Sequence, residues 1–346
     1  MSFDSLLVNT EHGLYCPAGG FYVDPRRPVD RAVVSHAHSD HARYGCRRYL
    51  AAAPGERLLR MRMNADAEFE FLPYGASVTL GGVRVSFHPA GHMLGSAQVR
   101  LEHGGKIAVV SGDYKLGDDA TCVAWEPVRC DLLVTESTFG LPVYRWSPAS
   151  LVMEEINAWW RSNRQRDLCS VLYAYAVGKS QRLLSGLDAS IGPIYTHGAV
   201  EKGTQAYRES GVELPRTRYV GELPTKHDYR GGIVVAVPSA HGTTWGRRFG
   251  KTSTAMASGW MAVRGARRRR SVDRGFILSD HVDWPSLITA VEQCDPETVW
   301  VTHGYSAIVA RYLCEIGRDA IAVEGVVRRE GEEDAMDGES EGASSL

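Results

Sequence analysis

The sequence predicts an α/β protein in which an inserted α/β domain divides a first α/β domain into two parts. Short buried strands in the first part each end on a polar residue, whereas longer helices alternate with strands from about residue 145. Near residue 275, buried strands that end in histidine return. Layered α/β folds show such alternation and build their sites at the carboxyl ends of strands. The predicted limits are 1–144 and 273–328 for the first domain, 145–272 for the insertion, and 329–346 for a tail.

Four strands of the first part support this prediction. They are the segments "RAVVS" (31–35), "VRVSFHPA" (83–90), "KIAVVSGD" (106–113) and "CDLLVTEST" (130–138). The first strand leads into the histidine cluster and the second into the segment "GHMLGSAQ". The third ends on an aspartate, and the fourth reaches a glutamate. We therefore expect a site where these strands end.

The inserted part begins with a predicted helix, "SPASLVMEEINAWWRSNRQ", with Ser147 as N-cap and Pro148 as its first residue. The segment "CSVLYAYA" reads as a strand, and "GKSQRLLSGLDA" reads as the helix that follows it. Two more strands are expected over 232–240 and 253–261. The segments "GFILSDHVDW" (275–284) and "ETVWVTHGY" (297–305) read as strands of the first domain again.

The composition indicates an ordinary soluble protein. The chain has 346 residues, of which 44% are hydrophobic and 23% charged. No apolar run approaches the roughly 20 residues of a membrane helix, and the N-terminus lacks the basic region of a secretory signal. The seven cysteines are scattered without a CxxC pair, which favours reduced thiols over a disulfide framework. These features predict a cytoplasmic protein with no membrane partner.

Charge is unevenly distributed along the chain. The net charge is −2, which argues against a strongly basic nucleic-acid binder. The last 17 residues, 330–346, hold seven acids and no lysine or arginine, so residues 1–329 carry a net charge of +5. A tail this acidic and this poor in apolar residues is expected to be disordered. The remainder is mildly basic.

The segment "VVSHAHSDHARYG" has candidate metal ligands as closely spaced as those of a metal site. His36, His38, Asp40 and His41 are four candidate ligands within six positions, directly after a buried strand. On an extended segment the side chains of His36 and His38 point to the same side. Asp40 and His41 follow and can face a second metal position. Imidazole and carboxylate ligands suit zinc. A lone histidine on a strand is more often a core residue, but four such groups are costly to bury without partners.

Three further residues complete the candidate ligand set. His92 lies between glycines in "PAGHMLGS", and His303 follows a buried strand in "VTHGY". Asp113 ends the strand "KIAVVSGD", where its carboxylate can bridge two metals. Each of these alone reads equally well as a structural residue. Together with the cluster they supply enough ligands for two ions.

The motifs resemble those of the metallo-β-lactamase fold. "SHAHSDH" is similar to its HxHxDH signature, and the dipeptides at 91–92 and 112–113 are similar to its next two motifs. Later motifs resemble the β-CASP nucleases, which include Artemis, Apollo, RNase J and the pre-mRNA cleavage endonuclease. Glu136, His281 and His303 match motifs A, B and C of that branch. "GLYCPAGGFYVDPRRPVDRAVVSHAHSDHARYG" and "ESTFGLPVYRW" resemble the bacterial DNA ligase-associated exonucleases.

This resemblance implies an αββα metallo-β-lactamase sandwich with an inserted β-CASP domain and two divalent ions. The implied ions are zinc, with manganese or magnesium as alternatives. The first site is implied to comprise His36, His38 and His92. The second is implied to comprise Asp40, His41 and His303, with Asp113 shared between the two.

Such a pair of ions, about 3.5–4 Å apart, activates water for phosphodiester hydrolysis. Asp40 and Asp113 then serve both as ligands and as catalytic residues. His281 is the candidate general acid for the leaving oxygen, because histidine titrates near neutrality. Glu136 is expected to orient it or hold it protonated, although it also reads as a solvated strand-end glutamate.

Substrate contacts are expected from the inserted domain. Helix starts attract phosphate, which is the basis for the candidates Lys179, Ser180 and Arg182, although a solvated helix cap is an equal alternative. "ASGWM" supplies a candidate phosphate pocket or base platform, or simply a packed tryptophan. The arginine run 267–270 favours backbone phosphates over a solvated loop. The remaining candidates from these two segments are Ser258, Gly259, Trp260, Arg267 and Arg268.

The sequence favours a metal-dependent DNA exonuclease that acts in repair on single strands or DNA ends. Association with a DNA ligase and a helicase is implied by the resemblance alone. The alternative is an RNA-processing nuclease, because histidine at motif C, here His303, is typical of RNA-acting members. An inserted domain of this size counts against a small-molecule hydrolase, and the intact ligand set counts against a catalytically dead binding module.

Overall fold

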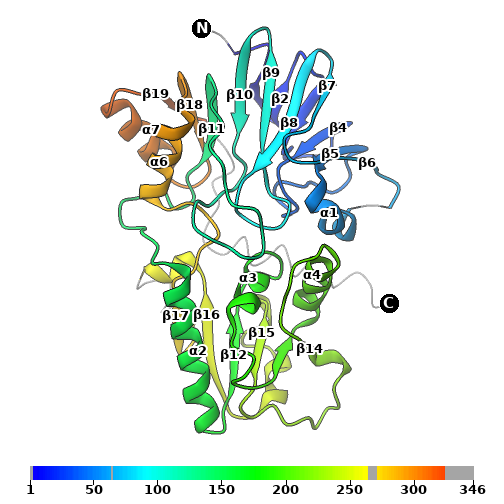
Figure 1. The fold of residues 1–346 in the computed structure, drawn as a ribbon, viewed down its shortest axis with the longest axis vertical. Helices are drawn as coiled ribbons and strands as arrows, with labels where there is room; N and C mark the ends of the chain where they lie inside the picture. Colours follow the sequence, from blue (N-terminus) through cyan, green and yellow to red (C-terminus); the bar gives the residue numbers. More distant parts are fainter. Residues whose placement is uncertain (1–2, 64, 264–270, 324–346) are drawn as a thin grey trace. The chain divides into compact units, whose positions relative to one another are not determined.

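The computed structural model describes residues 3–63, 65–263 and 271–323, which form two compact units. One unit combines the described residues up to Arg145 with those from His281 onward. The other is the described part of Trp146–Asp280. Figure 1 shows both units as ribbons and labels many of their helices and strands.

The first unit contains a six-stranded sheet whose strands follow chain order. Its first three strands pair antiparallel, and from the third onward the neighbours pair parallel. A short turn η1 and a helix α1 connect its fifth and sixth strands. The elements are β1 (Val8–Thr10), β2 (Gly13–Cys16), β3 (Phe21–Val23), β4 (Arg31–Val34), β5 (Arg48–Ala52), η1 (Ala53–Gly55), α1 (Glu56–Arg62) and β6 (Glu68–Leu72).

A seven-stranded sheet in the same unit has the order β19-β18-β11-β10-β9-β8-β7. β10, β11, β18 and β19 pair parallel, whereas β7 to β10 form antiparallel neighbours. Consequently β8 and β10 run in the same direction. The strands are β7 (Ser77–Leu80), β8 (Val83–Pro89), β9 (Ala97–His103), β10 (Lys106–Val110), β11 (Leu132–Glu136), β18 (Thr298–Thr302) and β19 (Asp319–Ala322).

Alternating residues of β10 divide the unit's core into two layers. Ala108 and Val110 join a cluster that contains side chains of both sheets, such as Phe21 and Phe87. Val109 points to the other face of its sheet, where α6 (Trp284–Cys294) and α7 (Ser306–Glu315) cover it. An α/β protein with several sheets is therefore confirmed. The full αββα sandwich with an inserted domain stays a prediction.

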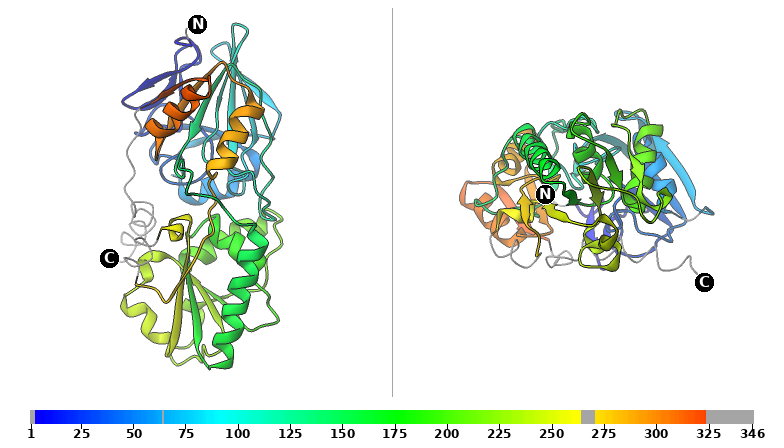
Figure 2. Two further views of the ribbon diagram at one scale, coloured as in Figure 1. Left: turned by 90° about the vertical axis from the view of Figure 1, so that its left-hand side faces the viewer. Right: turned by 90° about the horizontal axis from the view of Figure 1, so that it is seen from below.

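The second unit is built on a six-stranded sheet with the order β14-β13-β15-β12-β16-β17 and parallel pairing throughout. Helices α2, α3 and α4 contribute apolar side chains to its core, and α2 runs alongside the strands (Figure 2). The helices are α2 (Ala149–Gln165), α3 (Lys179–Gly186) and α4 (Gly198–Glu209). The strands are β12 (Cys169–Tyr173), β13 (Ile194–Thr196), β14 (Arg218–Tyr219), β15 (Ile233–Ala236), β16 (Thr252–Ala257) and β17 (Arg274–Phe276). The short turns are η2 (Val220–Glu222), η3 (Pro238–Ala240), η4 (Thr244–Phe249) and η5 (Gly259–Ala262).

Two local predictions differ from the structure. Helix α2 begins at Ala149 with Pro148 as its N-cap, one residue later than predicted, because Pro148 has an extended backbone with ψ of 134°. The strand predicted over 275–284 ends at Phe276, and β17 pairs with β16 in the second unit. The hydrophobic run therefore completes the parallel sheet of that unit and does not return to the first one until His281.

Within the described residues, no helix is both long and apolar enough to cross a membrane. All seven cysteines are free thiols in the structure. The acidic tail 329–346 lies outside the described residues.

Candidate metal centre

Five chain segments of the first unit deliver the candidate ligands to one place. Because β8, β10, β11 and β18 run in the same direction, their carboxyl ends lie at one edge of the second sheet. The histidine cluster follows β4 of the first sheet. The residues that follow or end these strands are His36, His38, Asp40, His41, His92, Asp113, Glu136 and His303.

Asp113 lies at the centre of the cluster. Its Oδ2 atom is 3.3 Å from Nε2 of His41 and 3.7 Å from Nε2 of His36. The same oxygen is 4.0 Å from Nε2 of His92 and 3.9 Å from Nδ1 of His281. One carboxylate oxygen thus faces histidines of both predicted metal sites as well as His281, as a shared ligand requires.

Three groups of possible ligands meet at Asp113, each with ligand atoms within 4.8 Å of one another. The first group is His36, His38, His92 and Asp113, and the second is Asp40, His41 and Asp113. The third joins Asp113 to Glu136 and His281. The first two groups match the two predicted sites except for His303.

A glycine permits this convergence. Gly112 precedes Asp113 and has a φ of +56°, a backbone conformation that L side chains rarely adopt. A Cβ atom at this position would lie 2.7 Å from Oγ of Ser35. The missing side chain therefore lets the end of β10 approach the end of β4, which brings Asp113 to the histidine cluster.

Asp24 and Ser35 fix the orientation of two histidines. Nδ1 of His41 donates to Oδ2 of Asp24 over 2.7 Å. The Ser35 hydroxyl donates to the same carboxylate over 2.6 Å and lies 3.0 Å from Nδ1 of His36, from which it can accept. Both rings thus carry a proton on Nδ1, so Nε2 is the atom that faces the centre and would bind a metal in its deprotonated form.

Two buried ring nitrogens without hydrogen-bond partners indicate that this set of side chains fits divalent ions. Among the residues that the structure describes, Nε2 of His36 and Nε2 of His41 are buried without a hydrogen-bond partner. Buried ring nitrogens normally find a partner, because an unmade hydrogen bond is costly. Both atoms face the Asp113 carboxylate, at 3.7 Å from His36 and 3.3 Å from His41, which are separations that two ligand atoms on one ion can have. Imidazole and carboxylate donors of this kind are those that zinc prefers.

The electrostatics of the cluster are unusual. Burial lowers the pKa of His36 well below its usual value, and the neighbouring His41 and His92 lower it further. Burial would also lower the pKa of His41, but the carboxylates of Asp113 and Asp24 outweigh it and raise that pKa well above its usual value. Neutral His36 is the form that binds a metal.

His303 lies at the edge of the cluster. Its ring centroid is 5.9 Å from that of His41, and it is not a member of the three groups found among the described residues. It adopts a φ of +57°, which is uncommon for a residue with a side chain. Hydrogen bonds from the Ser137 hydroxyl to its carbonyl and between Nδ1 and the Thr302 hydroxyl hold it there. Its role as a ligand stays a prediction.

Glu136 and His281 form a buried pair next to Asp113. Nδ1 of His281 lies 3.0 Å from both carboxylate oxygens of Glu136 and donates to that carboxylate. The backbone N–H of Tyr114 donates to the same glutamate over 3.1 Å. Glu136 is therefore buried and hydrogen-bonded, unlike a solvated strand-end residue, and it orients the His281 ring.

The candidate substrate contacts of α3 have internal partners in the second unit. Nη1 of Arg182 donates to Oδ1 of Asp280 over 2.9 Å, and Nζ of Lys179 lies 3.5 Å from Oδ2 of the same residue. The hydroxyl of Ser180 donates to the carbonyl of Tyr175. Since these polar groups already have protein partners, their contact with phosphate stays a prediction.

The "ASGWM" segment follows β16, as the sequence indicated. Ser258 is the N-cap of η5 and its hydroxyl accepts from the N–H of Trp260 over 3.3 Å. Gly259 is buried, and the tryptophan is half-buried. Arg267 and Arg268 lie outside the described residues, so their contact with substrate is untested.

The sequence reasoning missed Asp24 and Ser35. Asp24 belongs to the segment "FYVDPRRP", 12 positions before the first histidine of the cluster. Nothing in its local pattern marks a metal site, because its partner His41 is brought to it only by the pairing of β3 with β4. Ser35 was visible as the residue before His36, and its position at the end of β4 was the one available signal.

We expect Asp24→Asn to weaken metal binding about 10- to 100-fold, because partners of this kind fix the tautomer and raise the basicity of a ligating histidine. Metal titration of the purified variant measures this. Asp30→Asn is the matched control, since Asp30 is an exposed ion-pair partner of Arg48. Equal metal affinity of the two variants would show that Asp24 does not position His41.

Comparison with known proteins adds the family context. No protein-family model matches the chain. A protein named "Probable DNA ligase" from Opitutus terrae is 35% identical over 318 residues, which cover 91% of this chain and 31% of that protein. "Endoribonuclease YSH1" from Gibberella zeae is 31% identical over 131 residues, which cover 36% of this chain and 15% of that protein.

An archaeal relative extends this comparison. The "RNase J-like protein" of Methanocaldococcus jannaschii is 26% identical over 215 residues, which cover 52% of this chain and 50% of that protein. This chain thus spans no more than half the length of these three curated relatives. A solved structure of a protein of unknown function from Enterococcus faecalis shares the fold, with a TM-score of 0.57 and 12% identity over 86% of this chain and 80% of that one.

The resemblance in the motifs is therefore supported at the level of the nuclease group. The relatives include the RNase J and pre-mRNA cleavage types that the motifs indicated, and one relative is named for a ligase. Homologues of this chain thus include nucleases of the metallo-β-lactamase β-CASP group, and the chain itself has a cluster of His and Asp side chains that could hold a metal ion.

Proposed function

We propose that the protein is a metal-dependent DNA exonuclease that hydrolyses phosphodiester bonds and acts beside a DNA ligase. The observation that carries this proposal is the position of Asp113 between the two ligand groups and the Glu136–His281 pair. Two divalent ions held by the seven predicted ligands would supply an activated water and charge stabilisation. Zinc suits these donors, and manganese or magnesium are alternatives.

The residues of the chain supply the proton for the leaving group. Nδ1 of His281 donates to Glu136, and Nε2 is the nitrogen assigned to carry a proton to the leaving oxygen. The hydrogen bond to Glu136 and the burial of the pair keep the ring in one orientation. An acid is useful here because an alkoxide is a poor leaving group.

The choice of DNA as the substrate rests on the extent of one match. The relative named as a probable DNA ligase matches 91% of this chain, whereas the match to the named endoribonuclease covers 36%. The alternative is an RNA-processing nuclease, and His303 at motif C favours it. The two functions share the same site and differ only in the nucleic acid that it accepts.

We expect end-labelled single-stranded DNA to be shortened from one end in the presence of Mn²⁺ or Zn²⁺, with matched RNA cleaved more slowly. Gel analysis of both oligonucleotides under identical conditions measures this. The Asp113→Asn protein is the control for contaminating nucleases. Faster cleavage of RNA would favour the alternative, and cleavage of neither would contradict the proposal.

A further inference from the structure

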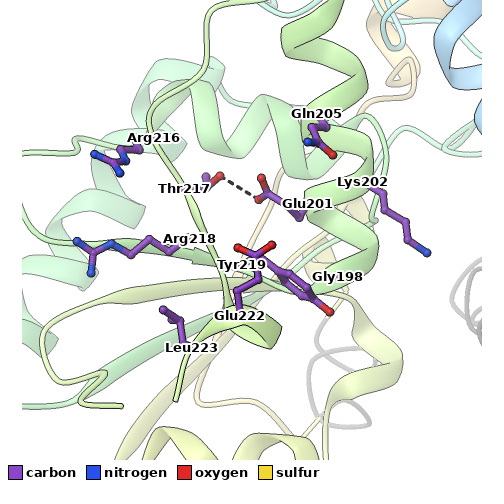
Figure 3. A pocket seen from close by; sticks show the side chains of 10 residues that line it. All are labelled: Gly198, Glu201, Lys202, Gln205, Arg216, Thr217, Arg218, Tyr219, Glu222 and Leu223. Atoms are coloured by element: carbon purple, nitrogen blue, oxygen red, sulfur yellow. Dashed lines mark hydrogen bonds between the residues drawn. The ribbon is translucent and has the colours of Figure 1, made fainter. Parts of the chain in front are cut away.

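A pocket of about 690 Å³ lies in the second unit, and no residue of the sequence motifs discussed above lines it. It is lined by the start of α4, by the edge strand β14 and by the turn η2 that follows it. Figure 3 shows the side chains around it. Its volume falls within the range of small-ligand sites, about 300–1,000 Å³. No residue of the predicted metal centre lines it.

Three basic side chains give the pocket its charge. Lys202, Arg216 and Arg218 are exposed, and none has an ion-pair partner within the part of the chain that the structure describes. Several other arginines of this unit pair with a carboxylate, as Arg230 does with Asp228. Unpaired cations around a cavity are available for an anionic ligand.

The acid inside the pocket is already neutralised. Glu201 accepts hydrogen bonds from the hydroxyls of Thr196 and Thr217 over 2.5 and 2.9 Å. Its other oxygen lies 3.3 Å from Nη1 of Arg208. This carboxylate therefore offsets little of the positive charge, and of the lining acids Glu222 alone is exposed.

The edge strand also supplies an aromatic ring in a fixed position. Tyr219 is 37% exposed and lines the pocket next to Gly198, the first residue of α4. A Cβ atom at Gly198 would lie 3.0 Å from its hydroxyl oxygen, and one at Gly221 would lie 2.3 Å from Cζ of its ring. The ring thus packs against two residues that have no side chain. Figure 3 shows it directed across the pocket toward the helix start.

From these features we infer that the pocket binds single-stranded nucleic acid, with backbone phosphates on Arg216, Arg218 and Lys202 and one base stacked on Tyr219. A positively charged surface combined with an aromatic platform is what single-strand binding needs. An acidic peptide would use the cations but not the ring. This inference rests on the proposed function, for which it adds a substrate-binding site separate from the metal centre.

Binding and cleavage can be tested separately on the full chain. Fluorescence anisotropy with labelled oligothymidylate and oligouridylate, in EDTA and over a range of salt concentrations, measures binding without hydrolysis. In the Arg216→Ser/Arg218→Ser variant the slope of log affinity against log salt should fall by about 1.4, because each lost single-strand phosphate contact contributes about 0.7. The Arg161→Ser/Lys251→Ser variant removes two exposed cations outside the pocket and should keep the wild-type slope.

The aromatic contact has its own pair of variants. Tyr219→Ala should weaken binding about 5- to 150-fold, the usual weight of one stacked base, whereas Tyr219→Phe should bind as the wild type does. The two oligonucleotides distinguish a preference for DNA from one for RNA. Affinity that depends on the arginines but not on Tyr219, and that polyglutamate abolishes, would assign the pocket to an acidic peptide and overturn the inference.

Failure of this inference differs from failure of the proposed function. Equal salt slopes for the pocket and control variants, or no binding by the wild type, would overturn the pocket assignment even if the protein cleaves DNA. Arginine- and tyrosine-dependent binding without metal-dependent cleavage would support the pocket and contradict the nuclease. Hydrolysis of a small phosphodiester should be the same for the pocket variants and the wild type, since no pocket residue belongs to the metal centre.

Discussion

The Asp113→Asn protein is expected to fold normally and to lose at least about 99% of its phosphodiesterase activity. The carboxylate faces both predicted metal sites, so a neutral amide weakens both at once. Metal ions supply several kcal/mol of charge stabilisation, and each 1.4 kcal/mol or so is a factor of ten in rate. Rate on a labelled oligonucleotide and metal content by mass spectrometry measure the two effects together.

The control for this variant is Asp131→Asn, which changes a partly exposed carboxylate that accepts from the N–H of Ile107 at the other end of β10. Circular dichroism and the thermal midpoint establish that both proteins are folded. If folded Asp113→Asn kept more than about a tenth of the wild-type rate, the loss would be smaller than the removal of a shared metal ligand causes. The assignment of Asp113 as that ligand would then be wrong.

His281→Ala is expected to lower the turnover number by about two to four orders of magnitude, the usual contribution of a general acid. Metal content should stay at the wild-type level, because Nδ1 of His281 is engaged with Glu136 and its assigned role is proton donation. The loss should depend on the leaving group. A substrate that expels nitrophenolate needs no proton and should react nearly as fast with the variant, whereas DNA should show the full loss.

His88→Ala provides a matched control for this experiment. His88 also pairs with a glutamate, with Nδ1 2.8 Å from Oε1 of Glu126, but it lies outside the metal centre. Its replacement should leave both substrates unaffected. Loss of a metal equivalent from His281→Ala would make that residue a ligand. Equal losses on both substrates would make it a positioning residue.

Much of the site was visible in the sequence because its residues follow buried strands. The apolar run of β10 places Asp113 at the strand end, and the parallel pairing of β10, β11 and β18 brings three such ends together. The density of His36 to His41 needed no tertiary information to suggest a metal. These residues were predictable because local pattern and global position agree.

Other features of the molecule could be recognised only from the three-dimensional fold. Asp24 meets His41 through strand pairing, and the pocket around Tyr219 depends on two glycines that are far from any motif. The extent of β17 was also misjudged, since an apolar segment does not reveal which of two sheets it joins. Lys179 and Arg182 looked available for phosphate at a helix start, but their partner in the structure is Asp280, which lies 98 positions after Arg182.

A metal titration of activity tests the central claim most directly. The protein is stripped with a chelator, metal is added back in measured equivalents, and the cleavage rate of single-stranded DNA is recorded at each step. The two-ion account predicts no activity in the stripped protein and a rate that reaches its plateau at two equivalents of metal per chain. A stripped protein that retained the full rate, or gained none at any metal concentration, would contradict it.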